Sequence, residues 1–360
     1  MAPHKKKSHH SEMERLVTLA QRAHDIDFSP EEERLADLIA RLVSRGLDHP
    51  IDRALDYLYA HDDLKAAERI LFWAEDAAST MDILLSSDQE ESRVGEITAF
   101  LVPLIFITPP SFMPPVSIPL PETLNQLARS FRQHHLIDAF PTLILLPELY
   151  RLQDLPTMWS TRHRWLQQLL AAATAQPYHL PTPSLESLGS NLSQHTVTIH
   201  LRFLVGAVIV DADEDSHRPL WDQEIPWGES ETMWSGASDW QETVITLLQK
   251  VLPDIIVLPD LPDLWSDALT SSLNLWNHVV MDTAWDIFRH QSTAPLNEIV
   301  ADIRWISQES VWSVTFVDPS RRSPPLLWMS PDDPSEQRQA LLDALHDHGI
   351  SRIQLNMQNL

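Results

Sequence analysis

The segment RFLVGAVIVDADEDSHRPLW, residues 202–221, decides the fold because a later segment has the same pattern. VWSVTFVDPSRRSPPLLW, residues 311–328, again leads from an apolar run through Val-Asp to a Leu-Trp pair at the same spacing. A second match links TLILLPEL, residues 142–149, with IIVLPDL, residues 255–261. Both kinds of match occur in the same order, which predicts a repeated unit of strand, short strand, helix and strand.

These units predict an α+β fold with a helical N-terminal layer followed by tandem related α/β units and connecting helices. The layer covers residues 12–78, where SPEEERLADLIARLVSRG has Ser29 as N-cap, Pro30 at the first helical position and Gly46 as the stop. A single unit cannot bury its apolar helix and sheet faces, so the copies are expected to pack together. The predicted units are residues 81–176 with a connecting helix, residues 195–290 with an insertion and a long helix, and residues 297–360.

The charge balance limits the partners. The chain has 51 acidic and 26 basic residues and a formal net charge of -25. Such a surface repels phosphate backbones and anionic lipids, so the body is not expected to bind nucleic acid or a membrane. The basic run HKKKSHH lies in residues 1–11, which are predicted to form a disordered tail. A regulator that contacts nucleic acid through this tail is one alternative function.

The composition also disfavours several chemistries. The chain has no cysteine, which removes disulfides, thiol nucleophiles and Cys-ligated metals. Its seven glycines are too scattered for a phosphate-binding loop, so no cofactor is predicted and an enzyme is disfavoured. The most apolar stretch, residues 97–107, is too short to span a bilayer, and no secretion signal follows the basic run. We therefore expect a cytoplasmic protein.

One stretch of the middle unit, QEIPWGESETMWSGASDW at residues 223–240, has no counterpart in the last unit. Aromatic side chains in an acidic loop suit a protein interface or a contact with a cationic group. They could instead fold back over the sheet as a lid on the core, or line a small-ligand pocket. The predicted partner-binding residues are Trp227, Trp234, Trp240, Glu229 and Glu231.

The loop DADEDSH offers an alternative site. Its oxygen and nitrogen ligands would serve a metal-dependent hydrolase, although a solvated hairpin turn explains them as well. Asp318 occupies the position that matches the first of these residues, and the two could form a carboxylate pair or cap turns at strand ends. The candidate metal ligands are Asp211, Asp213, Asp215 and His217.

The segments RFLVGAVIV, AFLVPLIFI and LPELYRLQDLP resemble a proteobacterial family of unknown function. The similarity extends over most of the chain from Ser29 onward. This resemblance implies no catalytic residues. The sequence thus predicts a non-catalytic interaction or scaffolding protein that binds a protein partner through the acidic, Trp-rich loop and the acidic surface. Open sheet edges could also pair with a second copy of the chain.

Overall fold

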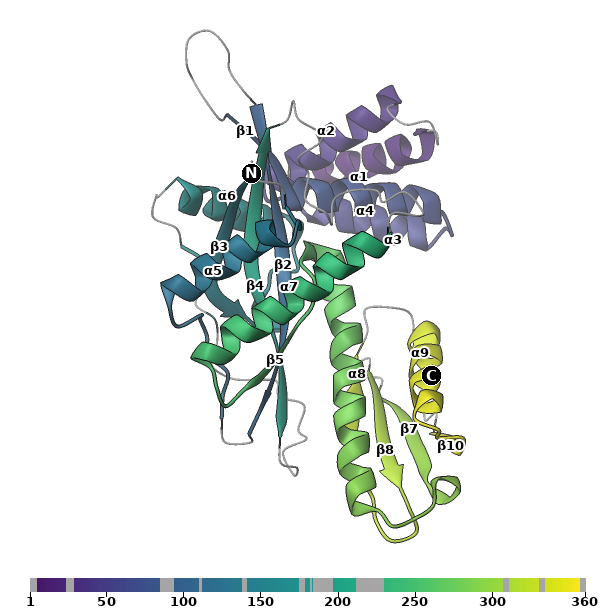
Figure 1. Cartoon of the computed structure of the whole chain (residues 1–360). Coiled ribbons are helices and arrows are strands. Elements are labelled where there is room, and N and C mark those ends of the chain that lie inside the picture. Colours follow the sequence, from purple (N-terminus) through teal and green to yellow (C-terminus); the bar gives the residue numbers. More distant parts are fainter. Residues whose placement is uncertain are drawn as a thin grey trace.

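The structure, a computed structural model, has a helical N-terminal layer and two sheets, with six strands in the main sheet and four in the C-terminal sheet among the residues that it describes (Figure 1). This confirms the predicted α+β class with a helical N-terminus followed by strand-containing units. The structure describes residues 5–23, 29–84, 94–109, 112–137, 141–174, 179–181, 183, 197–211, 230–306, 311–329 and 334–356. Within these ranges it describes all side chains except those of residues 5–11, 230–235 and 334–336.

The helical layer consists of α1 (Lys5–Arg22), α2 (Pro30–Ser44), α3 (His49–Tyr59) and α4 (Leu64–Ser79). The Ser29 side chain accepts a hydrogen bond from the Glu32 N–H at 3.2 Å, and Gly46 has a φ of 73° just beyond α2. These local signals give α2 its predicted start and end. Apolar side chains from all four helices form one core.

The basic run differs from the expectation. α1 begins at Lys5, so residues 5–11 belong to a helix and not to the predicted disordered tail. The physical reason is that extending an existing helix by further turns costs little once the buried turns around Leu16 have formed.

The strands of the main sheet are β1 (Thr80–Leu84), β2 (Val94–Thr108), β3 (Thr142–Tyr150), β4 (Thr198–Asp211), β5 (Ile256–Pro259) and β6 (Asp263–Leu264). β2 and β4 form a long antiparallel pair at the centre. β3 pairs with the other edge of β4, whereas β1, β6 and β5 follow one another along the other edge of β2. The register places Phe100 opposite Gly206, where a Cβ would lie 2.4 Å from the Phe100 ring. A glycine is therefore required at this close approach.

Helices cover both faces of the main sheet (Figure 1). The covering helices are α5 (Pro121–Gln133) and α7 (Ser230–Val251) on one face, and α6 (Trp159–Ala173) and the start of α8 (Trp265–Gln291) on the other. Side chains alternate between the two faces along each strand. Phe100 and Val102 thus lie in the core under α5 and α7, whereas Leu101 lies in the core under α6.

The C-terminal sheet has the strand order β10-β7-β8-β9. Its elements are β7 (Val300–Ile306), β8 (Val311–Val317), β9 (Leu326–Trp328), α9 (Pro334–Asp347) and β10 (Ile353–Asn356). The second half of α8 packs with α9 on one face of this sheet, and the same core reaches Ile105 and Ile199 of the main sheet. α8 therefore belongs to two cores. Short 3-10 helices lie at Leu152–Asp154 (η1) and Leu296–Glu298 (η4).

Strand direction distinguishes the predicted units. β3 lies beside β4 and β5 lies beside β2, so each of the first two units provides an edge strand next to the long strand of the other. Each edge strand runs parallel to the long strand of its own unit, β3 to β2 and β5 to β4. In the last unit β10 is parallel to β7 and therefore antiparallel to β8. The prediction that residues 203–261 and 311–357 share one arrangement is wrong on this point, because β7, which the sequence pattern did not predict, forms a hairpin with β8 and pairs with β10.

The two LPEL and LPDL motifs mark edge strands. The pairing of β3 with β4 shifts register between Leu145 and Leu149, around Pro147. β5 ends at Pro259, and pairing with β2 resumes only at Asp263 in β6. Proline has no N–H to donate, so it is tolerated at a sheet edge or at an interruption of this kind.

Candidate functional site

A pocket of about 720 Å³ lies where α2 and α4 meet β1. We call it the acidic pocket. Its charged lining residues are Asp37, Asp76, Asp82, Glu96, Arg41 and His163. The carboxylates outnumber the basic groups even when His163 is protonated, so the pocket favours a cationic ligand over an anionic one.

Local structure brings these carboxylates together. α4 ends at Ser79 and β1 begins at the next residue, so the last turn of the helix stays close to the strand and Asp76 and Asp82 line one pocket. The register of β1 against β2 places Asp82 directly opposite Glu96. Like charges opposite each other on paired strands repel. The Thr98 hydroxyl donates a hydrogen bond to Glu96 Oε1 at 3.4 Å, which stabilises this carboxylate beside Asp82.

The basic side chains of the pocket are oriented by backbone carbonyls. His163 Nδ1 lies 3.0 Å from the Ala77 carbonyl oxygen, and because a carbonyl oxygen only accepts, Nδ1 carries the hydrogen. Arg41 Nε donates to the Asp37 carbonyl oxygen at 3.0 Å. Both side chains are thus tied to helix backbone next to the pocket carboxylates.

A second pocket, of about 710 Å³, lies between β1 and α6. We call it the apolar groove. Residues 81–84 of β1 form one wall. The other wall comes from the C-terminal part of α6 and the residue after it, and Ile209 of β4 adds to it; the residues of that second wall are Gln167, Leu170, Ala171, Ala173 and Thr174. Met81 and Asp82 line both pockets, so β1 lies between them. The Leu84 side chain is 74% exposed, which leaves apolar surface at this end of the strand.

β1 lines both pockets and is the end strand of the path β1-β2-β4-β3. Within the described ranges β1 pairs only with β2, through residues 80–84 against residues 94–98. In an antiparallel pair, alternate residues direct their backbone N–H and C=O groups away from the partner strand. The outer edge of β1 therefore presents hydrogen-bonding groups beside the acidic pocket and the apolar groove.

A partly buried ion pair joins two walls of the acidic pocket. Arg162 Nη1 lies 2.7 Å from Glu75 Oε2, and the guanidinium lies 5.1 Å from the centre of the Trp159 ring and 5.8 Å from that of Trp265. Glu75 also accepts the Ser266 backbone N–H at 3.2 Å, at the start of α8. Burial lowers the pKa of Arg162, and the charge of Glu75 opposes that change. Each member of the pair is followed directly in the chain by a pocket residue, so the pair holds α4 against α6.

Carboxylates at the start of α8 have raised pKa values. Burial raises the pKa of Asp263 to about 6, and repulsion from Asp267 and Asp260 adds to this, whereas the hydrogen bond from the Leu264 N–H to Oδ1 at 2.8 Å acts in the other direction. Burial also raises the pKa values of Asp260 and Asp267. The charge of these groups therefore affects the stability of the junction between β6 and α8.

The structure corrects one predicted partner-binding residue. Trp240 is fully buried, and its ring packs edge-on against Phe131 with 5.3 Å between centroids. A side chain without exposed surface cannot contact a partner, so Trp240 is a core residue, as the folded-back interpretation has it. Trp227 and Glu229 lie outside the described residues. Trp234 and Glu231 lie in α7, but the structure does not describe their side chains. α7 has 22 residues and α9 has 14, so part of the unmatched stretch is helix.

Of the predicted metal ligands, the structure describes only Asp211, which is partly exposed at the end of β4. The others, Asp213, Asp215 and His217, lie outside the described residues. Within the described ranges, no group of three or more His, Asp and Glu residues could hold a metal ion.

Asp318 does not pair with Asp211, because it follows β8 of the C-terminal sheet, whereas Asp211 ends β4 of the main sheet. Its carboxylate accepts hydrogen bonds from Ser292 Oγ, from the Ser320 N–H at 2.7 Å and from the Arg321 N–H at 2.8 Å. These bonds, led by that of Ser292, lower the pKa of Asp318 to about 2. Asp318 therefore caps a turn after β8, which is the second interpretation of its position.

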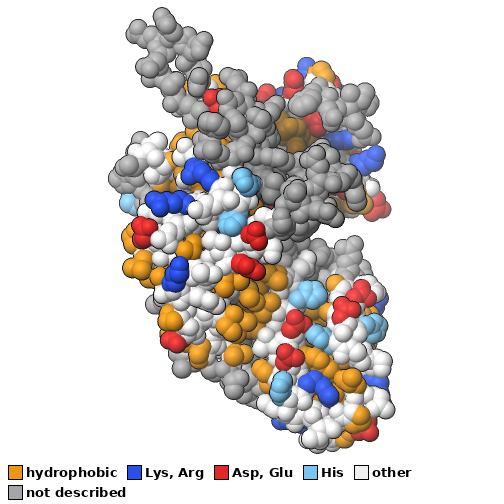
Figure 2. Space-filling view, viewed as in Figure 1, with side chains coloured by type: hydrophobic (Ala, Val, Ile, Leu, Met, Phe, Trp, Pro, Cys, Tyr) orange, Lys and Arg blue, Asp and Glu red, His pale blue; other side chains and the backbone are white. Residues whose placement is uncertain are grey.

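α8 has a polar face toward solvent. His278, Asp282, Asp286 and His290 are exposed on successive turns of the helix, and His348 Nε2, just after α9, lies 3.0 Å from Asp282 Oδ1. Figure 2 shows histidine and acidic side chains gathered on this face of the C-terminal part, over α8 and α9. This arrangement is typical of a solvated helix face.

These observations define an α+β protein with two pockets beside an edge strand. The chain belongs to the family described as "Protein of unknown function (DUF2863)", whose model matches residues 1–272. This confirms the resemblance to a family of unknown function. No curated protein and no solved structure matches the chain. Among the described helices, none combines the length and apolar character that a bilayer crossing requires.

Sequence reasoning missed the acidic pocket because its charged residues come from separate segments of the chain. Asp37 resembles any acidic residue on the polar face of a helix, and Glu96 resembles a strand-end charge. The one local signal is Asp82 within the apolar strand MDILL, since an acidic side chain is unusual in a strand.

Proposed function

We propose that the protein is a non-catalytic interaction or scaffolding protein that binds a basic segment of a protein partner in the acidic pocket. The observation that carries this proposal is the convergence of four carboxylates, from α2, α4, β1 and β2, on one pocket of about 720 Å³. Pockets of several hundred Å³ accommodate small ligands or single side chains of a partner. A cytoplasmic location, which the cysteine-free composition favours, is part of the proposal.

Lysine or arginine is the chemistry that fits this pocket. The side chain of either residue can reach past a wall of apolar atoms with its alkyl stem and place its charge between carboxylates. Asp82 and Asp37 are exposed, so their interaction with a bound cation is partly screened by water and salt. Electrostatic recognition of this kind gives modest affinity and a clear salt dependence.

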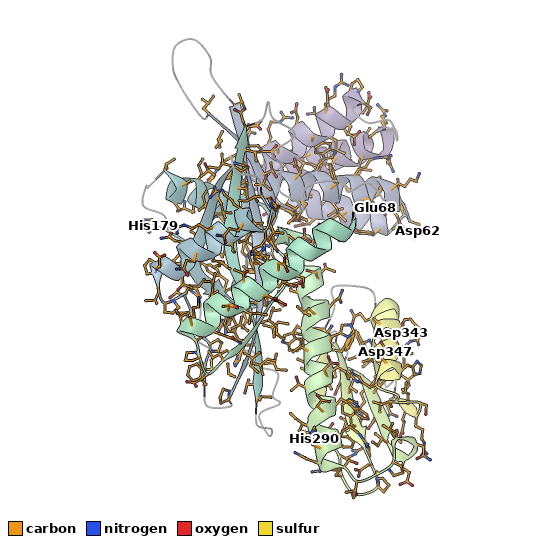
Figure 3. All side chains as sticks on the ribbon, viewed as in Figure 1. Asp62, Glu68, His179, His290, Asp343 and Asp347 are labelled. Atoms are coloured by element: carbon orange, nitrogen blue, oxygen red, sulfur yellow. The ribbon has the colours of Figure 1, made fainter. Side chains whose placement is uncertain are left out.

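The binding test uses the full chain and a fluorescein-labelled heptapeptide of alternating lysine and valine, followed by fluorescence anisotropy near physiological salt. Asp37→Asn combined with Asp82→Asn should weaken binding about tenfold, because each replacement removes a partly exposed charge pair. The control, Asp343→Asn combined with Asp347→Asn, removes the same charge from α9, away from the helical layer (Figure 3). Its affinity should change less than about twofold.

Equal losses in the two double variants would show that the peptide responds only to net charge, and the pocket would then have no special role. An unaltered protein that does not bind the peptide at all would also reject the proposal.

The acidic, Trp-rich stretch is proposed as a second contact for the same partner. Trp227 and Trp234 supply large apolar surfaces at little entropic cost, and Glu229 and Glu231 add acidic charge beside them. In a pull-down with the full chain, replacing both tryptophans with alanine should lower the captured amount of any protein whose capture also depends on Asp37 and Asp82. Unchanged recovery of such a partner would remove this stretch from the proposal.

A further inference from the structure

We propose that the partner segment binds in an extended conformation, as an additional strand on the outer edge of β1. This inference rests on the proposed function of the acidic pocket and specifies how the basic segment is held. It commits to one occupant: a protein segment in which basic and aliphatic residues alternate.

The position of β1 in the sheet supports strand addition. β1 occupies the end of the path β1-β2-β4-β3, and β5 and β6 pair with a separate part of β2, beyond residues 94–98. Addition of a strand to an exposed sheet edge is a recurring mode of peptide recognition, in which backbone hydrogen bonds give affinity and side-chain pockets give specificity. β1 has a pocket on each side of this edge.

The two faces of β1 differ in chemistry, and this predicts the alternation of the partner. Asp82 and Glu96 are register partners and therefore project to the same face of the sheet. Met81 and Ile83 project to the other face, where they pack against the core under α6. In an added strand, the residue beside Asp82 would meet carboxylates and the residues beside Met81 and Ile83 would meet apolar side chains. A basic residue flanked by aliphatic residues satisfies both faces.

An exposed charge on an edge strand can also serve to prevent pairing with other chains. Asp82 would oppose the addition of an aliphatic strand, because such a strand would bury the Asp82 carboxylate beside apolar side chains. It has the opposite effect on a strand that places lysine or arginine beside it. The same residue thus discriminates between partners, which is the usual way that specificity arises at an interface.

The test separates backbone pairing from charge attraction. Two versions of the lysine–valine heptapeptide are N-methylated on alternate residues, one version on the valines and the other on the lysines. Only alternate N–H groups of an added strand point toward β1, so one version should lose about tenfold or more in affinity and the other should bind nearly as well as the parent peptide. The Asp37→Asn and Asp82→Asn double variant should weaken all versions that bind.

Hydrogen exchange provides the second measurement on the full chain. The parent peptide should slow the exchange of alternate backbone N–H groups within residues 80–84, and the peptide that loses affinity on N-methylation should not.

Equal binding by both N-methylated versions, with loss of affinity in the aspartate variant, would overturn strand addition and leave the proposed function standing. Strand addition would also be overturned if the N–H groups of residues 80–84 that point away from β2 were already protected without peptide, because the outer edge would then be occupied. Failure of every peptide to bind would overturn both proposals.

Discussion

Asp263→Asn is expected to stabilise the protein at neutral pH. Asp263 lies in β6, two residues before α8, and its Oδ1 accepts the Leu264 N–H at 2.8 Å. An asparagine keeps this acceptor and removes the charge. Burial raises the pKa of Asp263 from 3.8 to about 6, with repulsion from Asp267 and Asp260 adding to the effect, so the folded state disfavours the ionised form.

The sign of the pH dependence follows from the direction of the change. A carboxylate with a raised pKa holds its proton more tightly in the folded state than in the unfolded state. Its contribution to stability is therefore most favourable below pH 3.8, declines as the pH rises toward about 6, and stays low above that value. The interval between 3.8 and about 6 corresponds to at most about 3 kcal/mol. Because Asp263 is partly exposed, water reduces this to about 1 kcal/mol.

Urea unfolding of the unaltered chain and of Asp263→Asn, between pH 5.5 and pH 8, measures this difference. The range stays above the sequence pI of about 4.9, where solubility is lowest. The variant should be more stable at pH 8 by about 1 kcal/mol, and its advantage should shrink toward pH 5.5. A variant whose advantage is the same at all pH values, or that is less stable at pH 8, would refute the reasoning that the folded state raises this pKa.

Four further substitutions test the packing of the protein by urea unfolding at pH 7.5. Glu75→Gln leaves the Arg162 charge buried without its ion partner and should lower the free energy of unfolding by about 2 kcal/mol. Adding Arg162→Met should recover part of this loss, and purely additive effects of the two substitutions would contradict the coupling between them. Gly206→Ala places a Cβ 2.4 Å from the Phe100 ring and should cost about 1–3 kcal/mol, so a neutral result would contradict the register of β2 and β4. Trp240→Ala should cost about 3–5 kcal/mol, and a cost near zero would return this residue to the surface.

The parts of the fold that the sequence predicts are those whose causes are local. Ser29, Pro30 and Gly46 give the bounds of α2 because a cap, a first-turn proline and a residue with positive φ act within one helical turn. The LPEL and LPDL motifs lie in the edge strands β3 and β5, where a proline at a strand interruption is a local backbone effect.

The parts that the sequence does not predict depend on contacts between distant segments. β7 lacks a clear alternation of apolar and polar residues, because the charged Asp302 is buried within it. Arg304, Arg322 and Asn356 donate hydrogen bonds to the Asp302 carboxylate, and no local sequence pattern shows these bonds. The stretch before Trp240 contains Ser and Gly, which favour a loop, yet burial of Trp240 against Phe131 holds it in α7. Tertiary packing thus overrides local propensity, and the same reason explains why the acidic pocket was missed.

The family model matches the part of the chain that contains the proposed binding site, residues 1–272. The matched residues end at Ser272, within α8 and before Trp276, whose side chain lies in the core shared with the C-terminal sheet. The acidic pocket, the apolar groove, β1 and the Glu75–Arg162 ion pair all lie inside the matched range. Contacts within the matched range hold the start of α8. Glu75 accepts the Ser266 N–H, and Trp165 packs edge-on against Trp265 with 5.8 Å between ring centroids. The proposed binding at β1 therefore requires only contacts that the matched residues make among themselves.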